Sequence, residues 1–256
     1  MKLAISGKGG VGKTTIAAGL SRRYTAKGFS VLAVDADPDA NLAGALGYDG
    51  DITPLSEMKE LIAERTGGQP GTYGAFVKLN PEVADLPDRL TVEVQGVKVL
   101  TLGAVKRGGG GCACPENVLL RNLLSHLILR RDEHVIVDME AGVEHLGRAT
   151  VQAVDALAVV VEPSQRSAGT AFRIRELARE IGLANVLAIG SKVKGPEDRG
   201  FLESRLEGFP ILGWISYNER IVRADQVGEG SALDAPLFVR EIDEIIGHLV
   251  RYQSDS

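Results

Sequence analysis

A glycine-rich segment near the start of the chain has the residues and the spacing needed to bind phosphate. Residues 7–15 read Gly-Lys-Gly-Gly-Val-Gly-Lys-Thr-Thr, which satisfies the pattern G-x-x-x-x-G-K-[ST] between a predicted strand and a predicted helix. Glycines let successive backbone N–H groups approach one anion, and the N-terminus of the next helix adds the positive end of its dipole. The segment therefore predicts a P-loop. A glycine-rich turn without a ligand is the disfavoured alternative.

Individual groups in this P-loop suit different parts of a nucleotide. Lys13 is expected to reach the β and γ phosphates, the Thr14 hydroxyl to be a ligand for Mg²⁺, and Thr15 to contact the α phosphate. The backbone groups around the phosphates are expected from Gly9, Gly10, Val11 and Gly12.

Lys8 is a second lysine that an ordinary P-loop does not need. Its long side chain, at the start of the loop, could reach the phosphates of a neighbouring subunit. There it would neutralise charge in the transition state, as an arginine finger does in trans. The alternative is a solvated surface lysine.

Two acidic segments follow predicted strands. Asp37 lies in residues 35–41, Asp-Ala-Asp-Pro-Asp-Ala-Asn, and Asp138 ends a β-branched run at 135–137. A carboxylate at the end of a buried strand beside a P-loop is placed to serve Mg²⁺, often through water. Turn and helix capping is the alternative for the first segment.

The two cysteines of the chain, Cys112 and Cys114, form a C-x-C pair just before Pro115, the predicted first residue of a helix. The helix N-terminus, with Lys106 and Arg107 upstream, favours the thiolate form. Two thiolates are too few for a closed four-coordinate site, but a symmetric dimer would supply four. Ni²⁺ and Zn²⁺ both suit these donors. A disulfide and inert packing remain as alternatives.

Residues 7–15, with Lys8, resemble the deviant Walker A motif of the MinD/ParA/nitrogenase-iron-protein group of ATPases. The resemblance implies a homodimer that binds ATP between its subunits. It assigns Asp37 to switch I, where it would orient or activate the attacking water. It assigns Asp138 to switch II and to Mg²⁺, with Gly142 as a pivot whose N–H lies near the γ phosphate.

The resemblance also indicates where the base would bind. Relatives carry Asn-Lys or Asn-Arg after a late strand, and this chain has Ser191 and Lys192 there, with a shorter first side chain. The backbone around Ile215 and Tyr217 is a second expected wall. ATP rather than GTP as the nucleotide rests on the resemblance.

The C-x-C pair and the residues 138–145, Asp-Met-Glu-Ala-Gly-Val-Glu-His, make the chain similar to the accessory ATPases that assist nickel insertion into carbon monoxide dehydrogenase. This similarity extends from Lys2 to the last predicted helix. It implies ATP-dependent metal delivery by a homodimer linked by nucleotide and metal, with carbon monoxide dehydrogenase as client.

Two other functions stay open. An iron protein with a [4Fe–4S] cluster between subunits would carry a cysteine just before Gly142, where this chain has Ala141. A MinD- or ParA-like positioning ATPase would need a membrane-seeking C-terminal helix or a basic patch for DNA. Residues 240–252 carry acids that disfavour anionic lipid, and the linear sequence shows no basic patch.

These residues must be positioned by regular elements. Continuous apolar runs predict strands that are covered on both faces, hence a parallel sheet, and their alternation with helical spacing predicts a doubly wound α/β fold of P-loop NTPase topology. The expected strands are 3–6, 31–34, 99–102, 135–137, 157–161, 186–189 and 211–215. The clearest expected helices are 14–27, 57–65, 118–131, 170–181 and 241–252.

One region departs from this pattern. Residues 90–94 and 97–101 alternate around Gln95-Gly96, which predicts a hairpin and a small antiparallel edge. Residues 67–87 are rich in Gly, Pro and polar side chains, so we expect an insertion over about 67–100 rather than a separate domain. A single P-loop ATPase domain is expected over residues 1–256.

Composition limits the partners. The 256 residues include 29 Lys and Arg against 34 Asp and Glu, a net charge of −5, which disfavours nonspecific nucleic-acid binding. No apolar run approaches the roughly 18 residues that a membrane span needs, and the apolar start is too short for a signal peptide. We expect a cytoplasmic protein with neither a nucleic-acid nor a membrane partner.

Overall fold

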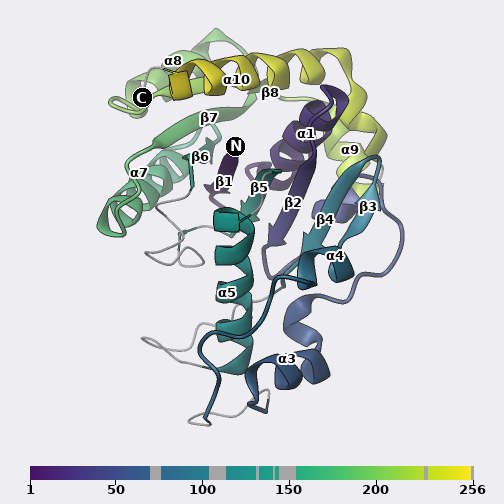
Figure 1. Cartoon of the computed structure of the whole chain (residues 1–256). Helices are drawn as coiled ribbons and strands as arrows, with labels where there is room; N and C mark the ends of the chain where they lie inside the picture. Colours follow the sequence, from purple (N-terminus) through teal and green to yellow (C-terminus); the bar gives the residue numbers. More distant parts are fainter. Residues whose placement is uncertain are drawn as a thin grey trace.

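The chain folds around one twisted β-sheet (Figure 1). The computed structural model describes residues 1–69, 76–103, 114–130, 133–140, 142–143, 154–227 and 230–254. Within them the eight strands lie in the order β3-β4-β2-β5-β1-β6-β7-β8. Every neighbouring pair is parallel except β3 with β4. The strands are β1 (Lys2–Gly7), β2 (Val31–Ala36), β3 (Val92–Val94), β4 (Val97–Thr101), β5 (His134–Met139), β6 (Ala156–Val161), β7 (Val186–Val193) and β8 (Ile211–Ser216).

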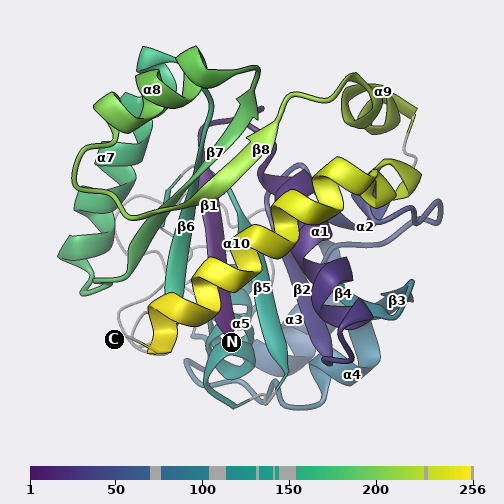
Figure 2. The same ribbon diagram turned by 90° about the horizontal axis from the view of Figure 1, so that it is seen from above.

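Helices cover both faces of this sheet, which confirms the predicted doubly wound α/β class. Figure 2 shows α1 and α10 lying over one face, and α5, α7 and α8 contribute apolar side chains to the core on the other. The helices are α1 (Lys13–Ala26), α2 (Leu42–Ala45), α3 (Lys59–Thr66), α4 (Leu86–Leu90), α5 (Pro115–Arg130), α7 (Gln165–Glu180), α8 (Pro196–Arg205), α9 (Glu219–Val227) and α10 (Pro236–Ser254), with 3₁₀ turns at Leu55–Glu57 and Gly230–Asp234.

The central strands are buried because their side chains are mostly apolar on both sides, whereas β3 and β8 at the two edges are only partly buried. Every residue of β2 and β6 is buried. Leu3 and Ile5 of β1 pack in the core under α1 and α10, whereas Ala4 packs in the core on the opposite face. This continuous burial is the pattern expected of a parallel sheet between two helical layers.

The predicted antiparallel edge is present as the hairpin of β3 and β4. Gln95 and Gly96 at its turn both have positive φ, 51° and 79°, as a two-residue hairpin turn of type I′ requires. The first strand is shorter than predicted, because Leu90 ends α4 and the strand begins at Val92. The short helices α2, α4, α8 and α9 were not predicted.

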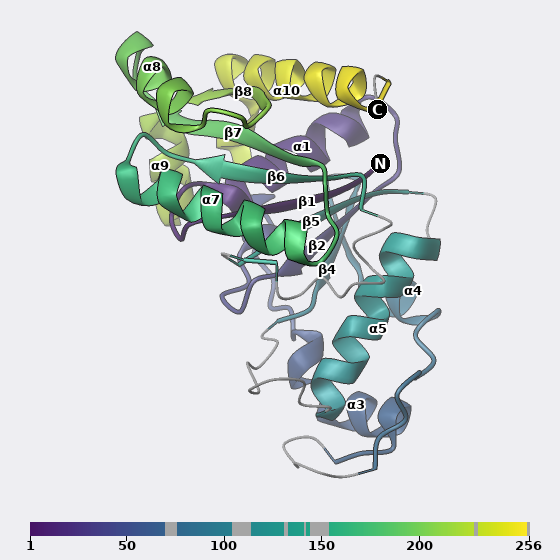
Figure 3. The ribbon, with the colours of Figure 1, turned by 90° about the vertical axis from the view of Figure 1, so that its left-hand side faces the viewer.

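Helices α3 and α5 extend beyond the sheet (Figure 3). The first residue of α5, Pro115, lies beside Gly68, just after α3: a Cβ on Gly68 would come within 2.8 Å of the proline ring. The start of α5 is thus held by the end of α3, away from the sheet. No helix among the described residues is long and apolar enough to cross a membrane.

Candidate functional site

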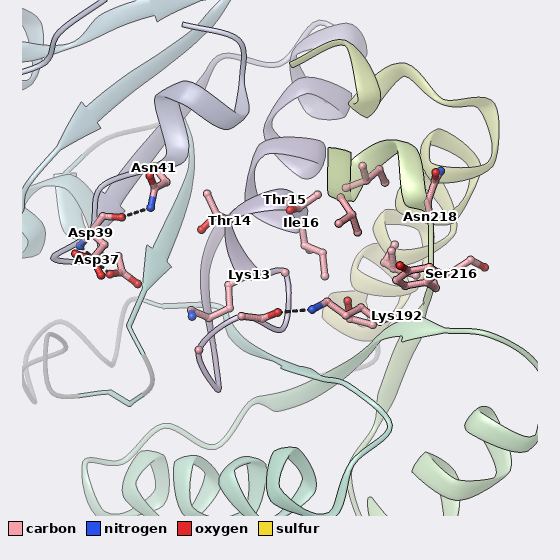
Figure 4. A pocket seen from close by; sticks show the side chains of 18 residues that line it. Lys13, Thr14, Thr15, Ile16, Asp37, Asp39, Asn41, Lys192, Ser216 and Asn218 are labelled. Atoms are coloured by element: carbon pink, nitrogen blue, oxygen red, sulfur yellow. Dashed lines mark hydrogen bonds between the residues drawn. The ribbon is translucent and has the colours of Figure 1, made fainter. Parts of the chain in front are cut away.

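The candidate site is a cavity of about 520 Å³ at the carboxyl ends of the parallel strands (Figure 4). It is bounded by the P-loop, the loop after β2, the end of β7 and the segment that leads from β8 into α9. The structure brings together at this cavity most of the residues predicted to bind the nucleotide: Gly9, Gly10, Gly12, Lys13, Thr14, Thr15, Asp37, Ser191, Lys192, Ile215 and Tyr217. Val11, also predicted, is completely buried behind the loop.

The shape of the P-loop depends on its glycines. Gly7 has a φ of 150°, and a Cβ there would lie only 2.5 Å from the carbonyl oxygen of Val160 on the neighbouring strand. Gly12 has a φ of 96° and precedes the first residue of α1 without any side-chain cap. The first N–H groups of α1 therefore remain available to an anion in the cavity.

Lys13 and Thr14 begin α1 and meet the end of β5. The Lys13 side chain is largely buried, yet makes no hydrogen bond or ion pair in the part of the chain that the structure describes. Asp138 is placed beside β1 by the register of the sheet, with Ile5 as its partner residue. Its side chain is 1% exposed, and neither carboxylate oxygen has a hydrogen bond of normal geometry among the described residues.

The pKa of Asp138 is raised to about 7, mainly by burial; the neighbouring Asp35 and Asp37 add to the rise, and Thr14 and Lys13 oppose it. The Thr14 hydroxyl is thus near enough to favour the charged carboxylate. A buried acid without geometric partners, beside a hydroxyl, is an arrangement that a divalent cation would satisfy. Thr14 and Asp138 therefore fit the Mg²⁺ that the sequence predicts.

Asp35 shapes the loop that carries Asp37. Its Oδ1 accepts the backbone N–H of Asp37 at 3.2 Å and its Oδ2 accepts that of Leu42 at 2.8 Å. Burial raises its pKa to about 6. Asp35 thereby joins both ends of the loop, and Asp39 and Asn41 hydrogen bond within the same loop. These contacts are of the turn and capping kind that the sequence left open as an alternative. Asp37 nevertheless faces the cavity (Figure 4).

The segment after β5 is tied to β1 by Ser6. The Ser6 hydroxyl accepts the N–H of Gly142 at 3.1 Å and lies within donating distance of two carbonyl oxygens, those of Glu140 at 3.0 Å and Gly142 at 2.9 Å. Gly142 has a φ of 142°. The N–H expected to lie near the γ phosphate is therefore bonded to a side chain here. Ala141 lies outside the described residues.

Lys8 is not free in solvent. Its ammonium lies 3.4 Å from Oε1 of Glu162, which follows β6, and Lys192 lies 3.9 Å from Oε2 of the same carboxylate. Lys192 also donates to the carbonyl of Gly10 at 2.5 Å (Figure 4). Sequence reasoning missed Glu162, although its place after a buried strand was the same signal that singled out Asp138.

The far end of the cavity, where a base is expected, contains more than the predicted residues. Asn218, Ile221 and Val222 also line it, from the start of α9. Tyr217 is partly exposed, with the Lys194 ammonium 5.0 Å from its ring centre. These residues were missed because no helix was predicted between residues 215 and 241, so nothing placed them against the P-loop.

The structure describes only one of the two predicted metal ligands. Cys114 is buried, and its carbonyl accepts the N–H of Val118 at 3.1 Å, so it immediately precedes the first turn of α5. The predicted start of this helix at Pro115 is confirmed. Cys112 lies outside the described residues, as do Lys106 and Arg107.

Comparisons with known proteins agree with this geometry. Residues 2–231 match the CobQ/CobB/MinD/ParA nucleotide binding domain. The chain is 46% identical over 232 residues to the carbon monoxide dehydrogenase accessory protein CooC of Rhodospirillum rubrum, covering 89% of this chain and 88% of that protein. It is 43% identical to an uncharacterised ATP-binding protein of Methanocaldococcus jannaschii, over 99% of each. A chain of the MinC:MinD cell division complex of Aquifex aeolicus has the same fold, with a TM-score of 0.69 and 22% identity over 99% of this chain and 96% of that one.

Proposed function

Because the chain belongs to the CobQ/CobB/MinD/ParA family of nucleotide-binding proteins and is an ATPase of that family, we propose that it works as a homodimer that couples ATP binding and hydrolysis to metal delivery. Nickel insertion into carbon monoxide dehydrogenase is the process that we infer it serves. The observation that carries this proposal is the 46% identity to CooC. The predicted C-x-C metal ligands, Cys112 and Cys114, give it a chemical basis.

The residues around the cavity have distinct parts in ATP hydrolysis. The N–H groups of the P-loop and the Lys13 ammonium bind the phosphates, and Thr14 and Asp138 hold Mg²⁺. The cation, when bound, neutralises phosphate charge as the bond to the leaving oxygen breaks. Asp37 orients the attacking water from a loop that Asp35 holds in shape.

The base is bound at the opposite end of the cavity. Ser191 and Lys192 lie on the β7 side, and Ile215 and Tyr217 on the β8 side. Apolar side chains from α9 extend this wall, which gives a flat ring a surface to pack against. ATP is the nucleotide inferred from the family.

A second copy of the chain completes the site. Lys8 neutralises charge on the phosphates bound by the partner, so hydrolysis depends on the dimer. Cys112 and Cys114 of the two copies together supply four thiolates to one Ni²⁺ or Zn²⁺ ion. ATP closes the dimer and hydrolysis opens it, and the change in sulfur geometry releases the ion to the client.

Metal analysis with size-exclusion chromatography tests this proposal. Wild-type protein and the Cys112→Ala/Cys114→Ala variant are loaded with Ni²⁺ or Zn²⁺ and run with an ATP analogue, with ADP and without nucleotide. We expect about one ion per two wild-type chains, a different affinity with ATP than with ADP, and no comparable binding by the variant.

ATP binding by the double cysteine variant is the control, because Cys114, the one of the two that the structure describes, does not line the nucleotide cavity. Equal metal affinity with ATP and ADP would remove the coupling. Iron and a visible absorption band in anaerobically purified protein would instead indicate a [4Fe–4S] protein. Activation of nickel-free carbon monoxide dehydrogenase by the loaded protein tests the client.

A further inference from the structure

Glu162, a carboxylate with no predicted role, contacts two lysines beside the nucleotide cavity. Its Oε1 lies 3.4 Å from the Lys8 ammonium and its Oε2 lies 3.9 Å from the Lys192 ammonium. Lys192 in turn donates to the Gly10 carbonyl at 2.5 Å. Each oxygen of the carboxylate thus faces a different lysine, and one of the two lysines is bound to the P-loop.

The fold fixes the position of this carboxylate. Glu162 directly follows β6, whose pairing with β1 sets Val160 opposite Gly7 at the start of the P-loop. The backbone N–H of Glu162 donates to the Ser167 hydroxyl at 3.1 Å, and the hydroxyl of Ser164, the N-cap of α7, lies 3.5 Å from Oε1. Glu162 is therefore held between the sheet and the start of α7.

The contact with Lys8 is one that can be broken. The side chain of Lys8 is 39% exposed and that of Glu162 is 24% exposed, and an ion pair with this exposure is weak. When Lys8 leaves, Lys192 still lies beside the carboxylate, so the charge of Glu162 is not left unpaired. Glu162 can then remain in place while Lys8 moves.

We propose that Glu162 is a positioning residue that keeps Lys8 within its own subunit until two ATP-bound copies meet. The inference rests on the proposed action of Lys8 in trans. In the proposed dimer the Lys8 ammonium leaves Glu162 for the partner's phosphates, so the carboxylate and the phosphates compete for it. A triphosphate carries more negative charge than a carboxylate and competes well. ADP, which lacks the γ phosphate, competes less well, and Lys8 returns to Glu162 after hydrolysis.

Dimerisation of four variants tests this role. Metal-free protein is studied by sedimentation equilibrium with Mg²⁺ and a non-hydrolysable ATP analogue. Glu162→Gln removes the charge but keeps the shape, and Glu180→Gln, an exposed glutamate at the end of α7, is the matched control. Lys8→Ala and the Lys8→Ala/Glu162→Gln double variant complete the set. Thermal denaturation of each variant shows whether it is folded. If Glu162→Gln does not fold, Glu162→Asp replaces it, because the shorter side chain withdraws the carboxylate from Lys8.

The expected result is stronger nucleotide-dependent dimerisation for Glu162→Gln. One such ion pair shifts an equilibrium by up to about fivefold, and a dimer has two, so the dissociation constant should fall by about 2-fold to 25-fold. Glu180→Gln should match wild type. In the Lys8→Ala background, Glu162→Gln should have no effect.

Two results separate this inference from the proposed function. If Lys8→Ala leaves dimerisation and hydrolysis unchanged, the action of Lys8 in trans is wrong, and the role of Glu162 is overturned with it. If Lys8→Ala weakens both, three results would overturn only the role of Glu162. Glu162→Gln could leave dimerisation unchanged or weaken it. It could also strengthen dimerisation by the same factor in the Lys8→Ala background as in wild type.

Discussion

Replacement of Ser6 by alanine should destabilise the protein through one specific group, the N–H of Gly142. The Ser6 side chain is completely buried, and its hydroxyl accepts that N–H at 3.1 Å while facing the carbonyls of Glu140 and Gly142. Alanine removes the acceptor and leaves a buried donor unsatisfied, at a cost of about 1–3 kcal/mol. For a chain of this length, a loss of about 2 kcal/mol lowers the Tm by roughly 4–8 °C.

Ser21→Ala is the matched control for this change. Ser21 is equally buried, but its hydroxyl only donates to the carbonyl of Ala17 one turn earlier in α1, so its loss leaves no buried N–H without an acceptor. Because alanine also has a high helix propensity, we expect Ser21→Ala to change the free energy of unfolding by less than about 0.5 kcal/mol. Urea and thermal denaturation of both variants, without nucleotide, measure the difference. Equal stability of the two variants would show that Ser6 does not hold Gly142.

Three further predictions concern the nucleotide cavity. Lys13→Ala should lose nucleotide binding, measured by calorimetry, because the buried ammonium that lines the cavity is gone; unchanged affinity would contradict its role. Asp37→Ala should bind ATP but accumulate as an ATP-bound dimer, measured by chromatography and nucleotide analysis, and normal turnover would exclude it as the group that orients water. Because burial raises the pKa of Asp35 from 3.8 to about 6 in the folded protein, its folded state holds the proton more tightly than the unfolded state. Wild type should therefore lose stability relative to Asp35→Asn as the pH rises from about 4 to 6. A difference between the denaturation midpoints of the two proteins that stays constant over this pH range would contradict the prediction.

The P-loop and the parallel sheet could be predicted because both depend on local patterns. The motif at residues 7–15 fixes its own backbone through glycines, and a continuous apolar strand such as β6 indicates burial on both faces without knowledge of its neighbours. The antiparallel hairpin was equally local, since Gln95 and Gly96 are suited to positive φ.

The contacts across the sheet could not be predicted, because they depend on strand order. Glu162 meets Lys8 only because β6 lies beside β1, and Ser6 meets Gly142 only because β5 lies on the other side of β1. Asn218 reaches the cavity from the position just before α9, a short helix that was not predicted from the sequence. No spacing in the sequence relates Lys8 to Glu162 or Ser6 to Gly142, because the two residues of each pair are more than 130 residues apart.

The extension of α3 and α5 beyond the sheet separates the start of α5 from the elements that build the nucleotide cavity (Figure 3). The start of α5, just after Cys114, lies against Gly68, two residues beyond the end of α3, whereas the nucleotide cavity is built at strand ends and on α1 and α9. A substitution near the beginning of α5 can therefore change the metal site that we propose without changing the residues that line the nucleotide cavity.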